Sequence, residues 1–127
     1  MNILADTNIF LEIILAQEKK NICKKYLEKN KNKIAVSDFS VHSIGIYLFR
    51  EKKHEAFLKF AKDILVNIPV LTIPKPGYEN LTARSNKYNL DFDDTHQAAI
   101  ALNFNLQIAT MDLDFKKIGD KIKVVFL

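Results

Sequence analysis

The chain has 127 residues, 48% of them hydrophobic, which is enough for one ordinary hydrophobic core, and we expect a single domain over residues 1–127. No stretch is long and apolar enough to span a membrane, and no secretory signal precedes the first apolar segment, so we expect a cytoplasmic protein with no membrane partner. The single Cys23 cannot form an internal disulfide, and we expect it to be a packing residue.

The formal net charge is +4, and the excess of basic residues lies in the first half of the chain. Residues 1–66 contain 12 Lys or Arg against 8 Asp or Glu, whereas residues 67–127 contain 7 of each. The densest basic stretch is most simply the solvated face of a helix, although such a surface also suits an enzyme that acts on a polyanion. That stretch comprises Lys19, Lys20, Lys24, Lys25, Lys29, Lys31 and Lys33.

The hydrophobic pattern of the first half predicts short buried strands that alternate with helices. The strands are expected at residues 2–6 and 33–37, and the helices at residues 8–17, 20–30 and 54–66. Residues 39–49 suit either a strand or a helix. We favour a helix, because parallel strands need crossover connections.

The second half continues the alternation. A third strand at residues 68–73 ends at Pro74, and later strands are expected at 106–110 and 122–127, with helices at 78–88 and 93–103. The last of these helices carries Ala98, Ala99 and Ala101, small residues that let it lie close to a sheet. The pattern predicts one α/β domain with a mostly parallel sheet of about five strands, covered on both faces.

Acidic residues recur where these elements begin or end. Asp6 follows the first strand, Asp94 opens the helix at 93–103, and Asp112 and Asp114 follow the strand at 106–110. Each has an ordinary explanation as a helix cap, a turn residue or a favourable charge in a first helical turn. Asp91 and Asp93 are likewise candidates to cap the helix that Asp94 opens.

Taken together, these carboxylates predict a metal site. Parallel strands end at one edge of a sheet, so Asp6 and Asp112 leave their strands side by side, and a crossover helix that leads into residues 106–110 begins at the same edge. Asp94 can therefore join them. Carboxylates gathered in one crevice repel each other, which a bound divalent cation relieves, and oxygen ligands favour Mg²⁺ or Mn²⁺.

Three segments, ADTNIF, DFDDTHQAAIA and LQIATMDLDF, occur in this order over nearly the whole chain. Their order and spacing resemble the PIN-domain nuclease family, which includes the VapC-type toxins of bacterial toxin–antitoxin pairs. The residues that match the family pattern are Asp6, Thr7, Asn8, Asp94, Ala98, Ala101, Thr110, Asp112, Asp114 and Phe115.

The resemblance implies a three-layer α/β/α sandwich and cleavage of single-stranded RNA that depends on Mg²⁺ or Mn²⁺. It implies that Asp6, Asp94 and Asp112 coordinate the metal, that Asp114 assists or serves a second metal, and that water is the nucleophile. Asn8 and Thr110 would orient these groups. It also implies a cognate antitoxin as partner. The apolar residues of 39–49 exceed what one helix face needs, and the surplus could serve an antitoxin or a homodimer: Ile44, Ile46, Tyr47, Leu48 and Phe49.

One position departs from the family pattern. The family usually carries a glutamate about six residues after the Ser that ends the second strand, here Ser37, and this chain has His42 and Ser43 there. Ser43 is therefore a weak candidate for metal or substrate contact, and Asp38 is the nearest carboxylate. The other histidines, His54 and His96, are expected at the surface.

The missing glutamate leaves a second function open, that of a catalytically impaired module that binds RNA or protein. A receiver-like signalling domain also gathers acidic residues around Mg²⁺. That class normally has an acidic pair after its first strand, where this chain has only Asp6, so it is the least favoured.

Overall fold

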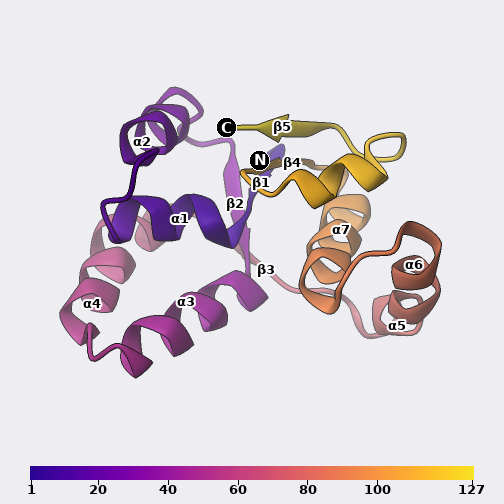
Figure 1. The fold of residues 1–127 in the computed structure, drawn as a ribbon, viewed down its shortest axis with the longest axis horizontal. Helices are drawn as coiled ribbons and strands as arrows, with labels where there is room; N and C mark the ends of the chain where they lie inside the picture. The colour runs from indigo at the N-terminus through magenta and orange to yellow at the C-terminus, as the bar shows by residue number, and fades with distance from the viewer.

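A parallel five-stranded sheet runs through the middle of the protein (Figure 1). The computed structural model describes residues 1–127, and the strand order is β3-β2-β1-β4-β5. In the register around the central strand, Leu4 lies opposite Ala35 on one side and Ile108 on the other. The strands are β1 (Ile3–Ala5), β2 (Ile34–Ser37), β3 (Val70–Leu71), β4 (Gln107–Thr110) and β5 (Val124–Phe126).

Helices connect the strands and cover both faces of the sheet, which confirms the predicted α/β sandwich. The ambiguous segment after β2 is a helix, as expected. None of the helices has the length and apolar character that crossing a bilayer requires. They are α1 (Thr7–Ile14), α2 (Lys20–Lys29), α3 (Asp38–Arg50), α4 (His54–Asp63), α5 (Lys75–Tyr78), α6 (Leu81–Tyr88) and α7 (Phe92–Phe104), with 3-10 helices η1 (Leu65–Asn67) and η2 (Leu113–Ile118).

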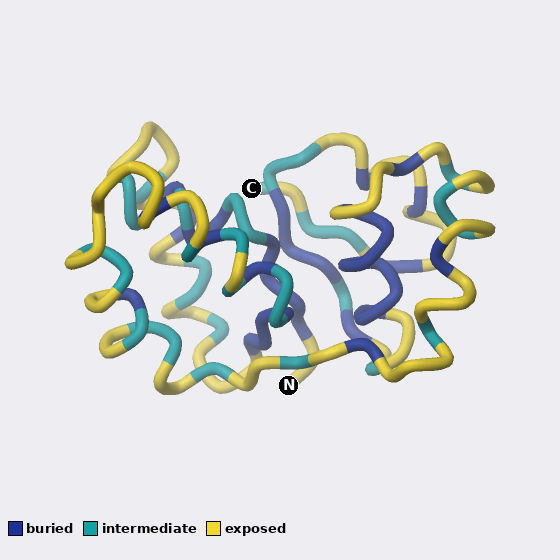
Figure 2. Tube along the Cα trace, turned by 90° about the horizontal axis from the view of Figure 1, so that it is seen from below, coloured by how far each residue is buried: buried dark blue, intermediate teal, exposed yellow.

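Alternating side chains of β1 divide the core into two halves. Leu4 packs into one half with residues of α6, α7 and η2, whereas Ile3 and Ala5 pack into the other with residues of α1 to α4. The period of two along a strand sends neighbouring side chains to opposite faces, so a strand covered on both sides is apolar throughout. The buried backbone in Figure 2 accordingly runs through the centre of the molecule. Cys23 is fully buried in the second half of the core, as its expected packing role requires.

Three elements differ from the sequence-based expectation. The strand expected at 68–73 is reduced to Val70–Leu71, an edge strand that pairs only with β2 and follows Pro69. Short edge strands limit unwanted pairing with other chains. The helix expected at 78–88 is divided into α5 and α6, and the 3-10 helix η2 follows β4 where no element was expected.

Two neighbouring residues of α3 test how the second core half contributes to stability. Leu48 is fully buried and Phe49 is 51% exposed. We expect Leu48→Ala to lower the free energy of unfolding by about 2–5 kcal/mol, because it leaves a cavity in the core. Phe49→Ala should cost about 1 kcal/mol, because it removes only contacts at the surface. Urea denaturation measures both values, and equal losses would contradict this division of the helix.

Candidate functional site

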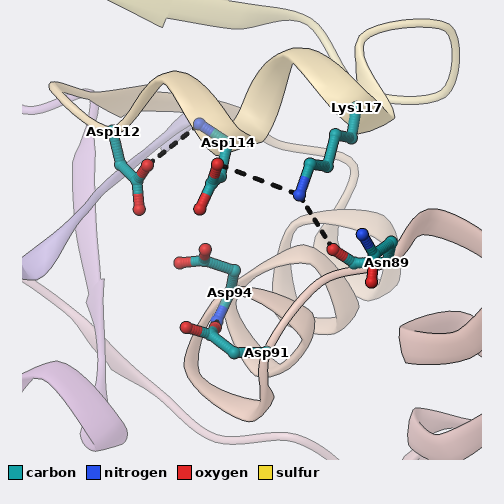
Figure 3. Close-up of polar contacts among 6 residues, drawn as sticks. All are labelled: Asn89, Asp91, Asp94, Asp112, Asp114 and Lys117. Carbon is teal, nitrogen blue, oxygen red and sulfur yellow. Dashed lines mark hydrogen bonds and ion pairs between the residues drawn. The ribbon is translucent and has the colours of Figure 1, made fainter.

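Three carboxylates converge at the edge where the strands end. Asp94 lies in the first turn of α7, and Asp112 and Asp114 lie at the start of η2, directly after β4. One oxygen from each lies within 4.8 Å of the others. Figure 3 shows Asp112 and Asp114 on one side of this space and Asp94 on the other. This arrangement follows from the topology, because α7 leads into β4 and therefore begins where β4 ends.

The same segments are also capped as ordinary helix starts. The carboxylate of Asp91 accepts a hydrogen bond of 3.0 Å from the backbone N–H of Asp94, and Asp112 accepts one of 2.9 Å from that of Asp114. Capping therefore holds the backbone of Asp94 and Asp114 in place. Asp91 is therefore a helix cap, as expected. Asp112 both caps η2 and belongs to the group of three carboxylates.

The negative charge of Asp94 is disfavoured by its surroundings, and no basic side chain contacts this carboxylate. It is 7% exposed, and burial raises the pKa of its carboxyl to about 7, with further increases from the charges of Asp91, Asp112, Asp6 and Asp114 in that order. The one ion pair in this region joins Lys117 to Asp114 at 3.8 Å, and both side chains are exposed to solvent. A set of hard oxygen donors with uncompensated charge fits a divalent cation such as Mg²⁺ or Mn²⁺.

Asp6 lies beside this cluster and is held by hydrogen bonds. Its Oδ1 accepts from the Thr7 backbone N–H at 2.8 Å and from Gln97 Nε2 at 3.0 Å. Its Oδ2 accepts from Thr110 Oγ1 at 2.7 Å and from Asn8 Nδ2 at 3.3 Å. Asn8 and Thr110, the residues expected to orient the carboxylates, therefore both contact Asp6. Four donors therefore fix the orientation of the Asp6 carboxylate.

Thr110 also connects Asp6 to the convergent cluster. Its hydroxyl donates to Asp6 and accepts a hydrogen bond of 2.9 Å from the Asp112 backbone N–H. The last residue of β4 thus fixes the positions of both carboxylates relative to the sheet. Loss of a group that orients a metal ligand in this way typically costs about tenfold to a hundredfold in metal affinity or activity.

The place of the family glutamate is filled by a neutral network. Ser43 is half-buried and makes no side-chain hydrogen bond, and His42 is exposed. One turn earlier, buried Ser40 Oγ accepts from Thr7 Oγ1 at 2.8 Å and from Gln97 Nε2 at 2.8 Å. The carboxylate of Asp38 accepts from the Phe39 backbone N–H at 2.8 Å and is outside the convergent cluster.

Sequence reasoning missed Gln97, which is 2% exposed and bridges Asp6 to Ser40. Its Oε1 has no hydrogen-bond partner, an uncommon state for a buried amide. The available signal was a glutamine one turn after Asp94, on a stretch of α7 that is otherwise rich in alanine.

His96 corrects the expectation of a surface histidine. It is 3% exposed and lies among the rings of Phe39, Tyr78 and Phe92. Burial lowers the pKa of its imidazole, against the opposing effect of nearby carboxylates, and Nδ1 has no partner. The expectation assumed that α7 has a solvent face, but eight consecutive residues, Asp94–Ala101, are buried.

The comparison with known families is consistent with this geometry. A family model described as the PIN domain matches residues 3–121. The chain belongs to the PIN-domain family. No curated protein matches the sequence.

Solved structures with the same fold come from several bacteria. A toxin–antitoxin complex from Klebsiella pneumoniae has a TM-score of 0.76 at 19% identity, covering 98% of this chain and 96% of the other. VapBC2 from Rickettsia felis, bound to a DNA fragment from its promoter, has a TM-score of 0.80 at 17% identity, with 98% and 97% covered. VapC20 from Mycobacterium tuberculosis, described as a toxin that cleaves the sarcin–ricin loop, has a TM-score of 0.74 at 15% identity, with 95% and 96% covered.

The raised pKa of Asp94 predicts how stability depends on pH. In metal-free protein the carboxyl keeps its proton to about pH 7 when folded, but loses it near pH 3.8 when unfolded. The folded state therefore binds more protons between these values, and its stability falls as the pH rises from about 4 to 7. Each pH unit between the two pKa values corresponds to about 1.4 kcal/mol, so the total loss is a few kcal/mol.

Asp94→Asn is the matched variant for this measurement. It keeps the shape of the side chain but cannot ionise, so we expect a smaller fall in free energy of unfolding across the same pH range. Urea denaturation in chelator at several pH values measures the difference. Parallel curves for wild type and Asp94→Asn would contradict the electrostatic burden assigned to Asp94.

Proposed function

We propose that this PIN-domain protein is a metal-dependent endoribonuclease that hydrolyses single-stranded RNA as the toxin of a toxin–antitoxin pair. The observation that carries the proposal is the convergence of Asp94, Asp112 and Asp114, against which the protein sets a single solvent-exposed cation, Lys117 at 3.8 Å from Asp114. The likeness to VapC20, which is described as cleaving the sarcin–ricin loop, supports RNA as the substrate. A toxin of this kind would act in the cytoplasm.

In this proposal the convergent carboxylates hold Mg²⁺ or Mn²⁺, with Asp6 completing the ligand set. When bound, the metal supplies an acidified water and neutralises charge that develops on the phosphodiester. Thr110 fixes Asp6 relative to Asp112. Asn8 makes the longest of the four hydrogen bonds to Asp6, 3.3 Å. Its bond would therefore be the easiest to break if the Asp6 carboxylate bound a metal ion.

An antitoxin is the proposed regulatory partner. The similar structure from Klebsiella pneumoniae is described as a toxin–antitoxin complex. On this chain, Ile46 and Phe49 of α3 are more than half exposed and Tyr47 is 38% exposed, whereas Ile44 and Leu48 are buried in the core. The exposed three are therefore the residues of this segment free to contact an antitoxin or a second copy of the chain.

A catalytically impaired RNA-binding or protein-interaction module is the second candidate function. The observation that favours it is Ser43, which places a neutral, half-buried hydroxyl where the family glutamate usually lies. Loss of one carboxylate removes a ligand and weakens the hold on a divalent cation. The two candidates differ in whether the protein has turnover that depends on its carboxylates.

Cleavage of single-stranded RNA distinguishes the candidates. We expect wild type to cut RNA with Mg²⁺ or Mn²⁺ and not in chelator, and Asp6→Asn and Asp94→Asn each to lower the rate by about a hundredfold or more, because each removes charge from the site. Quantitative gel analysis of cut products measures the rates. A wild type that cuts no faster than either variant would favour the impaired module.

A further inference from the structure

A cluster of four aromatic rings lies at the same edge of the sheet as the carboxylates. Phe39 comes from the first turn of α3, Tyr78 from α5, and Phe92 and His96 from α7. The centroid of the His96 ring lies 5.3 Å from that of Phe39, 6.0 Å from that of Phe92 and 6.3 Å from that of Tyr78. His96 is thus the centre of the cluster.

Two of the rings face solvent. Phe92 is 56% exposed and Tyr78 is 50% exposed, whereas His96 beneath them is 3% exposed. An aromatic side chain stabilises a fold mainly by burying its apolar area, and these two residues leave about half of their area exposed to solvent. Exposed apolar groups that lie together beside a functional site are typical of a contact surface.

The backbone holds both exposed rings in place. Phe92 is the first residue of α7 and follows its cap, Asp91. Tyr78 follows Gly77, where a Cβ atom would lie 2.6 Å from Cγ1 of buried Ile73. Only glycine permits this close approach of α5 to Ile73 without a shift. The two exposed rings are therefore attached to helices, α7 and α5, whose backbones are held in place by their own contacts.

The chemistry around the rings selects what they can bind. Phe92 stands between Asp91 and Asp93, which are exposed, and Asp38 precedes Phe39. These carboxylates repel a phosphate, attract a cation and tolerate a neutral group. The nucleobase is the flat, uncharged part of an RNA substrate, and stacking on an aromatic ring is its usual mode of recognition in single-stranded nucleic acid.

We propose that Phe92 and Tyr78 form a stacking subsite for the base of a nucleotide next to the phosphate that is cleaved. The inference rests on the proposed ribonuclease function and assigns part of its substrate binding. Phe92 and Asp94 share the first turn of α7 but face different sides of it, so an RNA strand whose phosphate lies at the carboxylate cluster would pass over the start of α7 to place a neighbouring base on these rings. Stacking is tolerant of base identity, so the subsite orients RNA without reading a strict sequence.

Substitutions at Phe92 test the subsite through the steady-state kinetics of RNA cleavage. Phe92→Ala should raise KM by about fivefold to a hundredfold with little change in kcat, because stacking contributes equally to substrate and transition state. Phe92→Trp should restore binding, whereas Phe92→Leu, which is apolar but cannot stack, should not. Phe104→Ala is the matched control, because Phe104 is a partly buried ring at the opposite end of α7 from Asp94.

RNA oligonucleotides with one abasic nucleotide on either side of the cleaved bond locate the base. The oligonucleotide that lacks the stacked base should raise the KM of wild type by the factor seen for Phe92→Ala on intact RNA. The KM of Phe92→Ala should be the same for that oligonucleotide as for intact RNA. The subsite is overturned if Phe92→Leu restores KM as well as Phe92→Trp, or if Phe92→Ala changes KM no more than Phe104→Ala does. It is also overturned if Phe92→Ala changes only the oligomeric mass by light scattering.

These results separate the two proposals. If wild type shows no carboxylate-dependent cleavage, the proposed ribonuclease function fails and the subsite fails with it. If wild type cleaves RNA and the Phe92 variants behave like the Phe104 control, only the subsite fails.

Discussion

Repulsion among carboxylates at one edge of a parallel sheet is the constraint on which this site depends. The topology creates it, because β1, β4 and the start of α7 all present acidic residues at that edge. Asp94 bears most of the cost: burial and then the charges of Asp91, Asp112, Asp6 and Asp114 raise its pKa to about 7. A cation bound among these carboxylates would relieve that cost, and for this reason the arrangement supports the proposed metal site.

The protein holds two buried carboxylates in opposite ways. Asp6 receives four hydrogen bonds, whereas Asp94 has acidic neighbours and no basic contact. Gln97 belongs to the first arrangement, since it joins Asp6 to Ser40 on the side where the family glutamate is absent. A neutral network can therefore keep Asp6 in place at a site that has lost one acidic residue.

The sheet and the convergence of Asp94 with Asp112 could be predicted from the sequence, because both follow from periodicity and from the shared direction of parallel strands. The third member of the cluster is Asp114, whereas the sequence pointed to Asp6. The network around Gln97 could not, since its partners lie 57 and 91 residues away in the chain. His96 was misplaced for a similar reason. Small residues such as Ala98 mark close packing, but the sequence does not say how many elements surround α7. The sequence also has no clear signal for the break between α5 and α6.

The most direct test of the central claim is calorimetric titration of Mn²⁺ into metal-free protein near pH 6, repeated in buffers of different ionisation enthalpy. If a cation relieves the repulsion, it must displace the proton that Asp94 holds below about pH 7, so binding should release close to one proton per site. Asp94→Asn should bind more weakly and release fewer protons. Binding without proton release, or no binding that depends on Asp94, would contradict the account.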